Sequence, residues 1–329
     1  MGIITPMFSQ TKVGTPANTN RLLHRAREAS RVLRVLSALL FASALLSLAA
    51  CNAPFGLALG TTATPTVPTT TPAPPTATPE PAVAIVNGER LPVREFQGQL
   101  AQYKDAQTSL NETVTDEEAS KAVLEDMIAQ VLLAQGAKAG GFELSDEALQ
   151  ARIDALQTKV GGADQLLKWE TNNGFDSPAA FRVALARSLA AAWMRDKIVS
   201  AVPRTADQVH VQQILLYNEG DANAVLEQLK IGAEFDTLAA QYDPNTRGDL
   251  GWFPRGYLLE PAIEQAAFSL QAGDYSGVIQ TEAGFSIIKV LERDANHALS
   301  PDAYLALQDA ALKSWITEQR AAANVVLAP

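Results

Sequence analysis

The sequence is poor in side chains that bind metals or form disulfides. Among its 329 residues there are one cysteine and three histidines. A single cysteine excludes an internal disulfide framework and a cysteine-rich zinc or iron–sulfur centre. The histidines, His24, His210 and His297, are too far apart in the sequence to suggest a pair of ligands. We therefore expect no metal site. We also expect no cofactor.

Positive charge is also scarce, and much of it lies at the start of the chain. The chain has 26 basic and 36 acidic residues, which gives a formal net charge of −10. Residues 1–50 hold six of the basic residues and one of the acidic ones, so the remainder carries −15. Because nucleic-acid-binding surfaces are basic, we expect no nucleic acid among the partners.

The basic start has the pattern of an export signal. Five arginines within residues 21–34 precede an uncharged run over residues 35–50, which predicts the n-region and h-region of a signal peptide. That run is shorter than the roughly 20 residues that a membrane-spanning helix needs. It ends in the tetrapeptide LAAC at Cys51, which resembles the lipobox of bacterial lipoproteins. The resemblance implies that residues 1–51 are a lipoprotein signal segment and that Cys51 is lipidated.

This interpretation sets the expected location of the protein. A lipid on Cys51 would anchor the chain to the cell membrane with its body on the extracytoplasmic side. The alternative is that Cys51 is a buried thiol that follows a retained anchor helix.

Residues 52–81 have the composition of a linker. From residue 60 onward almost every residue is Thr, Pro or Ala. Such a segment cannot form a packed core and favours extended, polyproline-like conformations. We expect a disordered Thr/Pro-rich spacer between the membrane surface and the folded part. The alternative is a proline-rich motif that a partner recognises.

Residues 82–205 predict a helical domain. A short apolar strand from Ala82 leads into a turn at Asn87-Gly88, and amphipathic helical patterns follow, with start signals at Ser145 and Ser177-Pro178. The VNGE turn, the segment EDMIAQVLLAQGAKAGGFELSDEAL and the helix FRVALARSLAAAWMRDKI resemble the N-terminal chaperone domain of SurA-like and PrsA-like extracytoplasmic folding factors. The resemblance implies a helical chaperone domain.

Residues 206–295 contain four sequence blocks in order, GDLGWF, RG, EQAAFSLQAGDYS and GFSIIKV. This set is similar to the parvulin family (PpiC-type, or rotamase) of peptidyl-prolyl isomerases. The resemblance implies an α+β domain, a four-stranded antiparallel sheet with surrounding helices. Residues 296–329 predict a helix that begins at Ser300-Pro301. In SurA-like proteins such a helix packs back on the chaperone domain, and the alternative is an autonomous tail helix.

The resemblance to parvulins also implies an apolar cup that holds the proline ring of the substrate. It places Leu250, Leu258 and Ile263 in this cup, where Leu258 takes the usual methionine position and Ile263 the usual phenylalanine position. The segment YLLEP is one residue longer than the common form, so Leu258 and Leu259 are both candidates. For Leu250 and Ile263 plain core packing is the alternative.

Parvulins line the floor of the cup with a polar network that usually includes two histidines and a cysteine or aspartate. In this chain Gln213 and Ser286 occupy the two histidine positions, and Thr281 matches a hydroxyl residue near the floor. Asp243 matches the cysteine or aspartate position, but because it precedes a proline it also suits a turn initiator. His210 lies three residues before Gln213, which on a strand points it to the opposite face, so we interpret it as a surface residue.

Together these patterns predict an extracytoplasmic folding factor. Its expected partners are unfolded or partly folded exported proteins with exposed prolines, whose X–Pro bonds it isomerises, together with the membrane that holds its lipid anchor. Because both histidines are replaced, we expect the isomerase activity to be reduced. The first alternative is a catalytically inactive chaperone that only holds clients, and a more distant one is a solute-binding lipoprotein.

Overall fold

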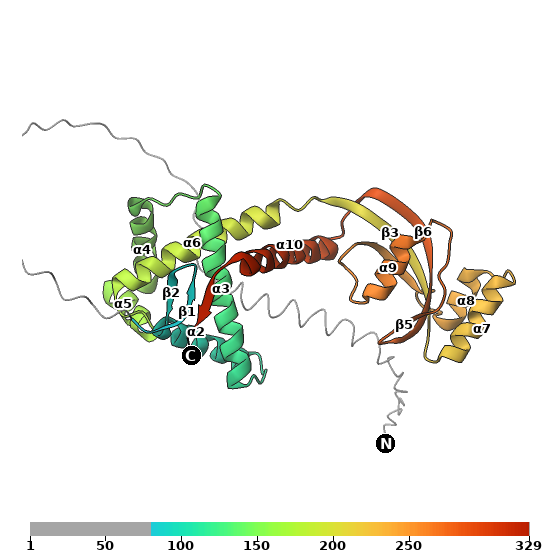
Figure 1. Ribbon diagram of the computed structural model, residues 1–329, viewed down its shortest axis with the longest axis horizontal. Coiled ribbons are helices and arrows are strands. Elements are labelled where there is room, and N and C mark those ends of the chain that lie inside the picture. Colours follow the sequence, from blue (N-terminus) through green and yellow to red (C-terminus); the bar gives the residue numbers. More distant parts are fainter. Residues whose placement is uncertain (1–79, 329) are drawn as a thin grey trace, which may run out of the picture. The chain divides into compact units, whose positions relative to one another are not determined.

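The computed structural model describes residues 80–328 (Figure 1). The predicted signal segment, Cys51 and residues 52–79 of the predicted linker lie outside the described residues. In the described part of the chain, no helix combines the length and the apolar character that a membrane span requires.

A small antiparallel sheet brings together residues from near both ends of the described chain. Strands β1 (Ala82–Val86) and β2 (Glu89–Pro92) form a hairpin through Asn87 and Gly88. Both turn residues have positive φ, 51° and 88°, as a two-residue hairpin turn with the twist of the strands requires. The sequence did not predict the third strand, β7 (Val325–Leu327), which pairs with the other edge of β1.

Six helices accompany this sheet. They are α2 (Val93–Ser109), α3 (Asp116–Ala139), α4 (Asp146–Val160), α5 (Ala163–Asn172), α6 (Pro178–Ser200) and α10 (Pro301–Ala322). The end of α2 belongs to a separate short unit, Asp105–Glu112, in which the Ser109 hydroxyl donates to the Asp105 carbonyl oxygen at 2.8 Å. We call the sheet and the helices, without that unit, the helical part.

Local signals explain where several helices begin. The side chains of Ser145, Ser177 and Ser300 each accept a hydrogen bond from the backbone N–H three residues later, which satisfies a donor that has no partner within the helix. At the start of α3, Thr115 and Glu118 form a reciprocal capping box.

The core of the helical part contains two apolar clusters. In the first, Leu91 from the small sheet packs against Met127 and Ile128 of α3. In the second, α3 and α6 meet α10, and Trp315 of α10 packs on alanines of the other two helices. A Cβ atom at Gly136 would lie 2.6 Å from the Trp315 ring, so glycine is required for this close approach. The C-terminal elements α10 and β7 therefore both pack against elements from the first half of the helical part, α10 against α3 and α6 and β7 against β1.

The second sheet has four strands, all antiparallel, in the order β4-β3-β6-β5 (Figure 1). Its strands are β3 (Thr205–Leu216), β4 (Asp249–Pro254), β5 (Ile279–Thr281) and β6 (Gly284–Ala298), and the accompanying helices are α7 (Glu219–Lys230), α8 (Phe235–Tyr242) and α9 (Pro261–Ser269). The expected α+β class, with a four-stranded antiparallel sheet and surrounding helices, is confirmed. We call this the isomerase part.

Alternation along β3 divides the isomerase part into two layers. Ile214 and Leu216 point to one face, where they pack against α7 and α8. Val209 and Val211 point to the other face and pack against α9. Gln213 points to the same face as Val209 and Val211, because it lies two residues after Val211 on the strand. The predicted floor of the site therefore lies on the α9 side of the sheet.

Candidate functional site

The predicted cup is built around α9. Ile263, in the first turn of α9, has only 5% of its surface exposed and belongs to the apolar cluster with Val211. Leu258, in the segment that leads into α9, is half-buried and packs on the same cluster. The next residue, Leu259, is 58% exposed. The structure therefore distinguishes the two leucines, because only Leu258 lies beside Ile263.

Leu250 occupies a different environment. It lies on β4, an edge strand of the sheet, and 36% of its surface is exposed. The apolar cluster around Ile263 does not include it. Core packing thus describes Ile263 in this structure but not Leu250, which is free to contact a bound chain.

The two residues at the histidine positions form a direct pair. The Gln213 side-chain amide donates to Ser286 Oγ at 2.7 Å. They lie on adjacent strands, β3 and β6, and are offset diagonally because Gln213 is opposite Ile288 while Ser286 is opposite Leu215. Ser286 has no exposed surface, whereas Gln213 is half-buried. Of the two side chains, only Gln213 therefore reaches the surface.

This pair can act as both donor and acceptor. In the arrangement observed, the Ser286 hydroxyl still has its own proton, and the Gln213 carbonyl oxygen still has lone pairs. Neither group titrates near neutral pH. The pair is therefore neutral, unlike one that contains histidine.

A glycine allows the GDLGWF segment to approach Gln213. The Gln213 backbone N–H donates to the Gly248 carbonyl oxygen at 2.8 Å. A Cβ atom on Gly248 would lie 1.8 Å from the Gln213 carbonyl oxygen, and the residue has φ of +70°. Both observations require glycine at this position.

The other two predicted floor residues take part in turns. Asp243 accepts hydrogen bonds from the backbone N–H groups of Asn245 and Thr246 and from the Thr246 hydroxyl, and these contacts lower the pKa of Asp243. The Thr281 hydroxyl donates to the Gly284 carbonyl oxygen at 3.1 Å in the turn between β5 and β6. The observed contacts of Asp243 are those of a turn initiator.

Sequence reasoning missed the role of Glu264, although the residue lies within the EQAAFSLQAGDYS block. Its carboxylate accepts hydrogen bonds from two backbone N–H groups, those of Gly256 and Leu258. No residue spacing indicated this contact, since it depends on the path of the irregular segment before α9.

His210 makes its side-chain contacts away from Gln213 and Ser286. Its imidazole lies 2.8 Å from a carboxylate oxygen of Asp249 and stacks on Trp252, with 5.5 Å between the ring centroids. On its other side Trp252 stacks on His297 at 4.0 Å. These contacts tie β4, β3 and β6 together, and none of them involves Gln213 or Ser286.

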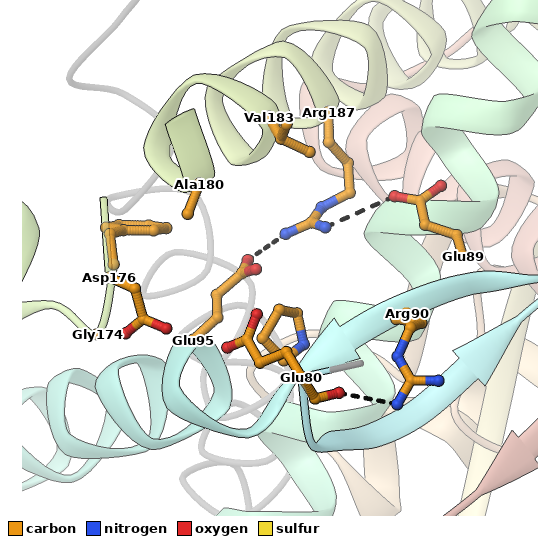
Figure 2. A pocket seen from close by; sticks show the side chains of 11 residues that line it. Glu80, Glu89, Arg90, Glu95, Gly174, Asp176, Ala180, Val183 and Arg187 are labelled. Carbon is orange, nitrogen blue, oxygen red and sulfur yellow. Dashed lines mark hydrogen bonds and ion pairs between the residues drawn. The ribbon is translucent and has the colours of Figure 1, made fainter. Parts of the chain in front are cut away.

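A second candidate site is a pocket in the helical part, beside β2 and α6 (Figure 2). Its lining includes Glu80, Glu89, Glu95, Asp176, Val183 and Arg187. Figure 2 shows the Arg187 guanidinium between two carboxylates: it forms a salt bridge with Glu95, and Glu89 lies 3.6 Å away. Arg187 and Glu95 are both buried, so they satisfy each other. The pocket is therefore best explained as a structural ion network.

Within residues 80–328 there is no group of three or more His, Cys, Asp or Glu side chains arranged to hold a metal ion.

Two family models match the chain. Residues 75–183 match the SurA-like N-terminal domain, and residues 217–292 match the PPIC-type PPIASE domain, or rotamase. Each match falls on the part of the sequence where the corresponding resemblance was found. The strand β3, which carries Gln213, lies just before the start of the second match.

Individual relatives also match. The foldase protein PrsA of Caldanaerobacter subterraneus subsp. tengcongensis is 26% identical over 63% of this chain and 72% of its own length. The chaperone SurA of Methylobacillus flagellatus is 34% identical over 37% of this chain and 33% of its own length. A crystal structure of peptidylprolyl isomerase PrsA from Bacillus anthracis is 26% identical, covers 59% of this chain and 88% of that chain, and has a TM-score of 0.33.

Proposed function

Because the chain joins a SurA-like N-terminal domain to a PPIC-type peptidyl-prolyl isomerase domain, we propose that it is an extracytoplasmic folding factor. It isomerises X–Pro bonds in exported proteins and binds their unfolded chains. The observation that carries the catalytic part of this proposal is the hydrogen-bonded pair of Gln213 and Ser286 on the same face of the sheet as Leu258 and Ile263.

The reaction requires neither a nucleophile nor a metal. Rotation about a peptide bond has a barrier of about 18–20 kcal/mol, because the C–N bond has partial double-bond character. For X–Pro bonds the two isomers differ by only about 0.5–1 kcal/mol, so a catalyst has only to lower the barrier. It does so by binding the twisted amide more tightly than either planar form.

The residues of this chain suit that task. Leu258, which packs on the apolar cluster of the buried Ile263, forms an apolar wall for the proline ring. Gln213 offers neutral hydrogen-bonding groups at the floor, and Ser286 holds its side chain in place. Such fixed dipoles favour one geometry of the amide over another.

A protease-coupled assay on an X–Pro tetrapeptide tests the proposal. The full chain, purified in detergent, is expected to accelerate cis-to-trans conversion above the thermal rate at micromolar enzyme. Failure to accelerate would refute the catalytic part.

The second candidate function is a chaperone without catalysis, and the replacement of both family histidines by Gln213 and Ser286 favours it. The helical part also exposes large apolar side chains, Leu167 and Trp169 on α5 and Val183 on α6. Suppressed aggregation of an unfolded client by a chain that does not accelerate isomerisation would establish this alternative. Aggregation that proceeds unchanged would exclude chaperone binding.

The membrane anchor is the third element of the proposal. It rests on the LAAC sequence at Cys51, after the export-type run. With the native sequence, the protein is expected in the membrane fraction, and Cys51→Ala should release it from that anchor. Retention of the Cys51→Ala chain in the membrane fraction would argue against lipidation at this residue.

A further inference from the structure

We propose that Glu264 is a positioning residue of the isomerase site, which holds Leu258 in place beside Ile263. This inference rests on the proposed isomerase function. The Gly256 N–H lies 2.9 Å from each carboxylate oxygen of Glu264, and the Leu258 N–H donates to one of them at 3.4 Å. These contacts join the carboxylate directly to the backbone of Leu258.

The segment held in this way has no regular structure of its own. Residues 255–260 connect the end of β4 to the start of α9 and lie in neither a strand nor a helix. Gly256 has φ of +79°, a left-handed conformation that favours glycine. The N–H groups of such a turn lack strand partners, and hydrogen bonds to a carboxylate are among the stronger ones available to them.

The position of Glu264 on α9 gives these contacts their significance. Ile263, its neighbour in the sequence, lies in the apolar cluster, and Leu258 packs on that cluster from outside. One helix therefore supports the cup from the core through Ile263 and fixes Leu258 through a carboxylate. Without Glu264, the turn is free to move Leu258 away from Ile263.

A positioning role and a general stabilising role have different kinetic effects. The proline ring occupies the cup in both planar isomers and in the twisted state, so loss of the cup wall weakens all three alike. Loss of such uniform binding raises KM and leaves kcat nearly unchanged. A variant that is merely less stable has less active enzyme, which lowers the apparent kcat and leaves KM unchanged.

The test compares three variants of the full chain in the tetrapeptide assay. Glu264→Ala is expected to raise KM about tenfold with kcat within about twofold, as expected for the loss of charge-assisted hydrogen bonds. Glu264→Gln should keep nearly normal KM, because the amide oxygen can still accept from both N–H groups. Gln265→Ala, at the exposed neighbouring position on α9, is the matched control and should equal the unmodified chain.

A double variant shows whether Glu264 acts through Leu258. If it does, Glu264→Ala adds nothing to the KM of Leu258→Ala, because the side chain that it positions is already gone. Additive effects of the two changes, or an unchanged KM in Glu264→Ala, would overturn the proposal. If Glu264→Ala does not fold, Glu264→Asp takes its place, because it keeps the charge but has a shorter side chain. An unchanged KM in Glu264→Asp would likewise overturn the proposal.

Hydrogen exchange separates this inference from the proposed function. The Gly256 and Leu258 amides should exchange faster in Glu264→Ala but not in Glu264→Gln, whether or not the chain is catalytic. If the unmodified chain does not accelerate isomerisation, the catalytic part of the proposed function fails. The positioning role of Glu264 is then tested by the dissociation constant of the peptide, which is measured in place of KM. Unchanged exchange at both amides would overturn the positioning role even in an active enzyme.

Discussion

The helical part and the isomerase part each contain a polar side-chain pair that joins distant segments of the sequence, and the two pairs differ in charge and in burial. In the helical part, Arg187 forms a salt bridge with Glu95. In the isomerase part, Gln213 donates to Ser286. The charged partners neutralise each other, whereas Gln213 is only half-buried and its side-chain carbonyl oxygen still has lone pairs to offer. The charged pair thus suits a structural role, and the neutral pair suits the floor of a binding site.

The largest expected effect tests the charged pair. Arg187→Ala leaves the buried Glu95 carboxylate without its partner, which should lower the free energy of unfolding by about 3–5 kcal/mol. Urea unfolding followed by circular dichroism measures this loss. Arg182→Ala, on the same helix, breaks a more exposed pair with Asp146 and should cost less than about 1 kcal/mol. Equal losses in the two variants would show that Arg187 and Glu95 have no special structural role.

A half-buried carboxylate on α3 tests the cost of charge in the helical part. Burial raises the pKa of Asp126 to about 6. Since this folded-state pKa lies above that of the unfolded chain, ionised Asp126 opposes folding, and the free energy of unfolding should rise as pH falls from about 6 towards 4. Asp126→Asn should stabilise the protein by about 1–3 kcal/mol at pH 7 and remove this pH dependence.

The measurement for Asp126 is urea unfolding at pH 7 and at pH 5. Glu117→Gln, at an exposed position on the same helix, serves as control and should change the stability by less than about 0.5 kcal/mol. A destabilised Asp126→Asn chain at pH 7 would mean that the carboxylate makes favourable contacts when ionised.

The apolar wall beside the neutral pair is tested by two adjacent leucines. Leu258→Ala removes a half-buried side chain that packs on the cluster of Ile263, and it should lower kcat/KM for an X–Pro peptide about tenfold. Leu259→Ala, which removes a side chain that is 58% exposed, should leave kcat/KM unchanged. The opposite ranking would place Leu259 in the cup.

The smallest expected effect concerns pH. Because neither Gln213 nor Ser286 titrates, kcat/KM should vary less than about twofold between pH 6 and 8, the range in which a histidine floor would change its charge. An assay without a coupling protease measures this profile directly. A bell-shaped profile would show that a titrating group contributes to catalysis.

Features that depend on local sequence could be predicted. The side chains of Ser145, Ser177 and Ser300 cap helices through contacts within three residues, so the sequence alone located those helix starts. The two-residue turn at Asn87-Gly88 is local in the same sense. The fold of the isomerase part was predictable because four motif blocks occur in order within one segment.

Features that depend on pairing over long distances could not be predicted. The three residues of β7 form a strand only because β1 offers a free edge, more than 200 residues earlier in the sequence. The resemblance to parvulins aligned Gln213 and Ser286 with the histidine positions, but the register of β3 and β6 was needed to show that they touch. Likewise, Arg187 and Glu95 meet across 92 residues. Arg187 lies in a segment that carries the resemblance to SurA-like proteins, but nothing in that segment indicates Glu95 as its partner.

Exchange spectroscopy on a proline peptide tests the central claim most directly, because it observes cis–trans interconversion at equilibrium without a protease. Uncatalysed interconversion takes tens to hundreds of seconds at 25 °C. The unmodified full chain should bring the exchange rate well above this thermal rate, and Gln213→Ala should reduce the acceleration several-fold while the protein stays folded. Exchange at the thermal rate with the unmodified chain, or an equal acceleration by Gln213→Ala, would contradict a catalytic floor built on the neutral pair.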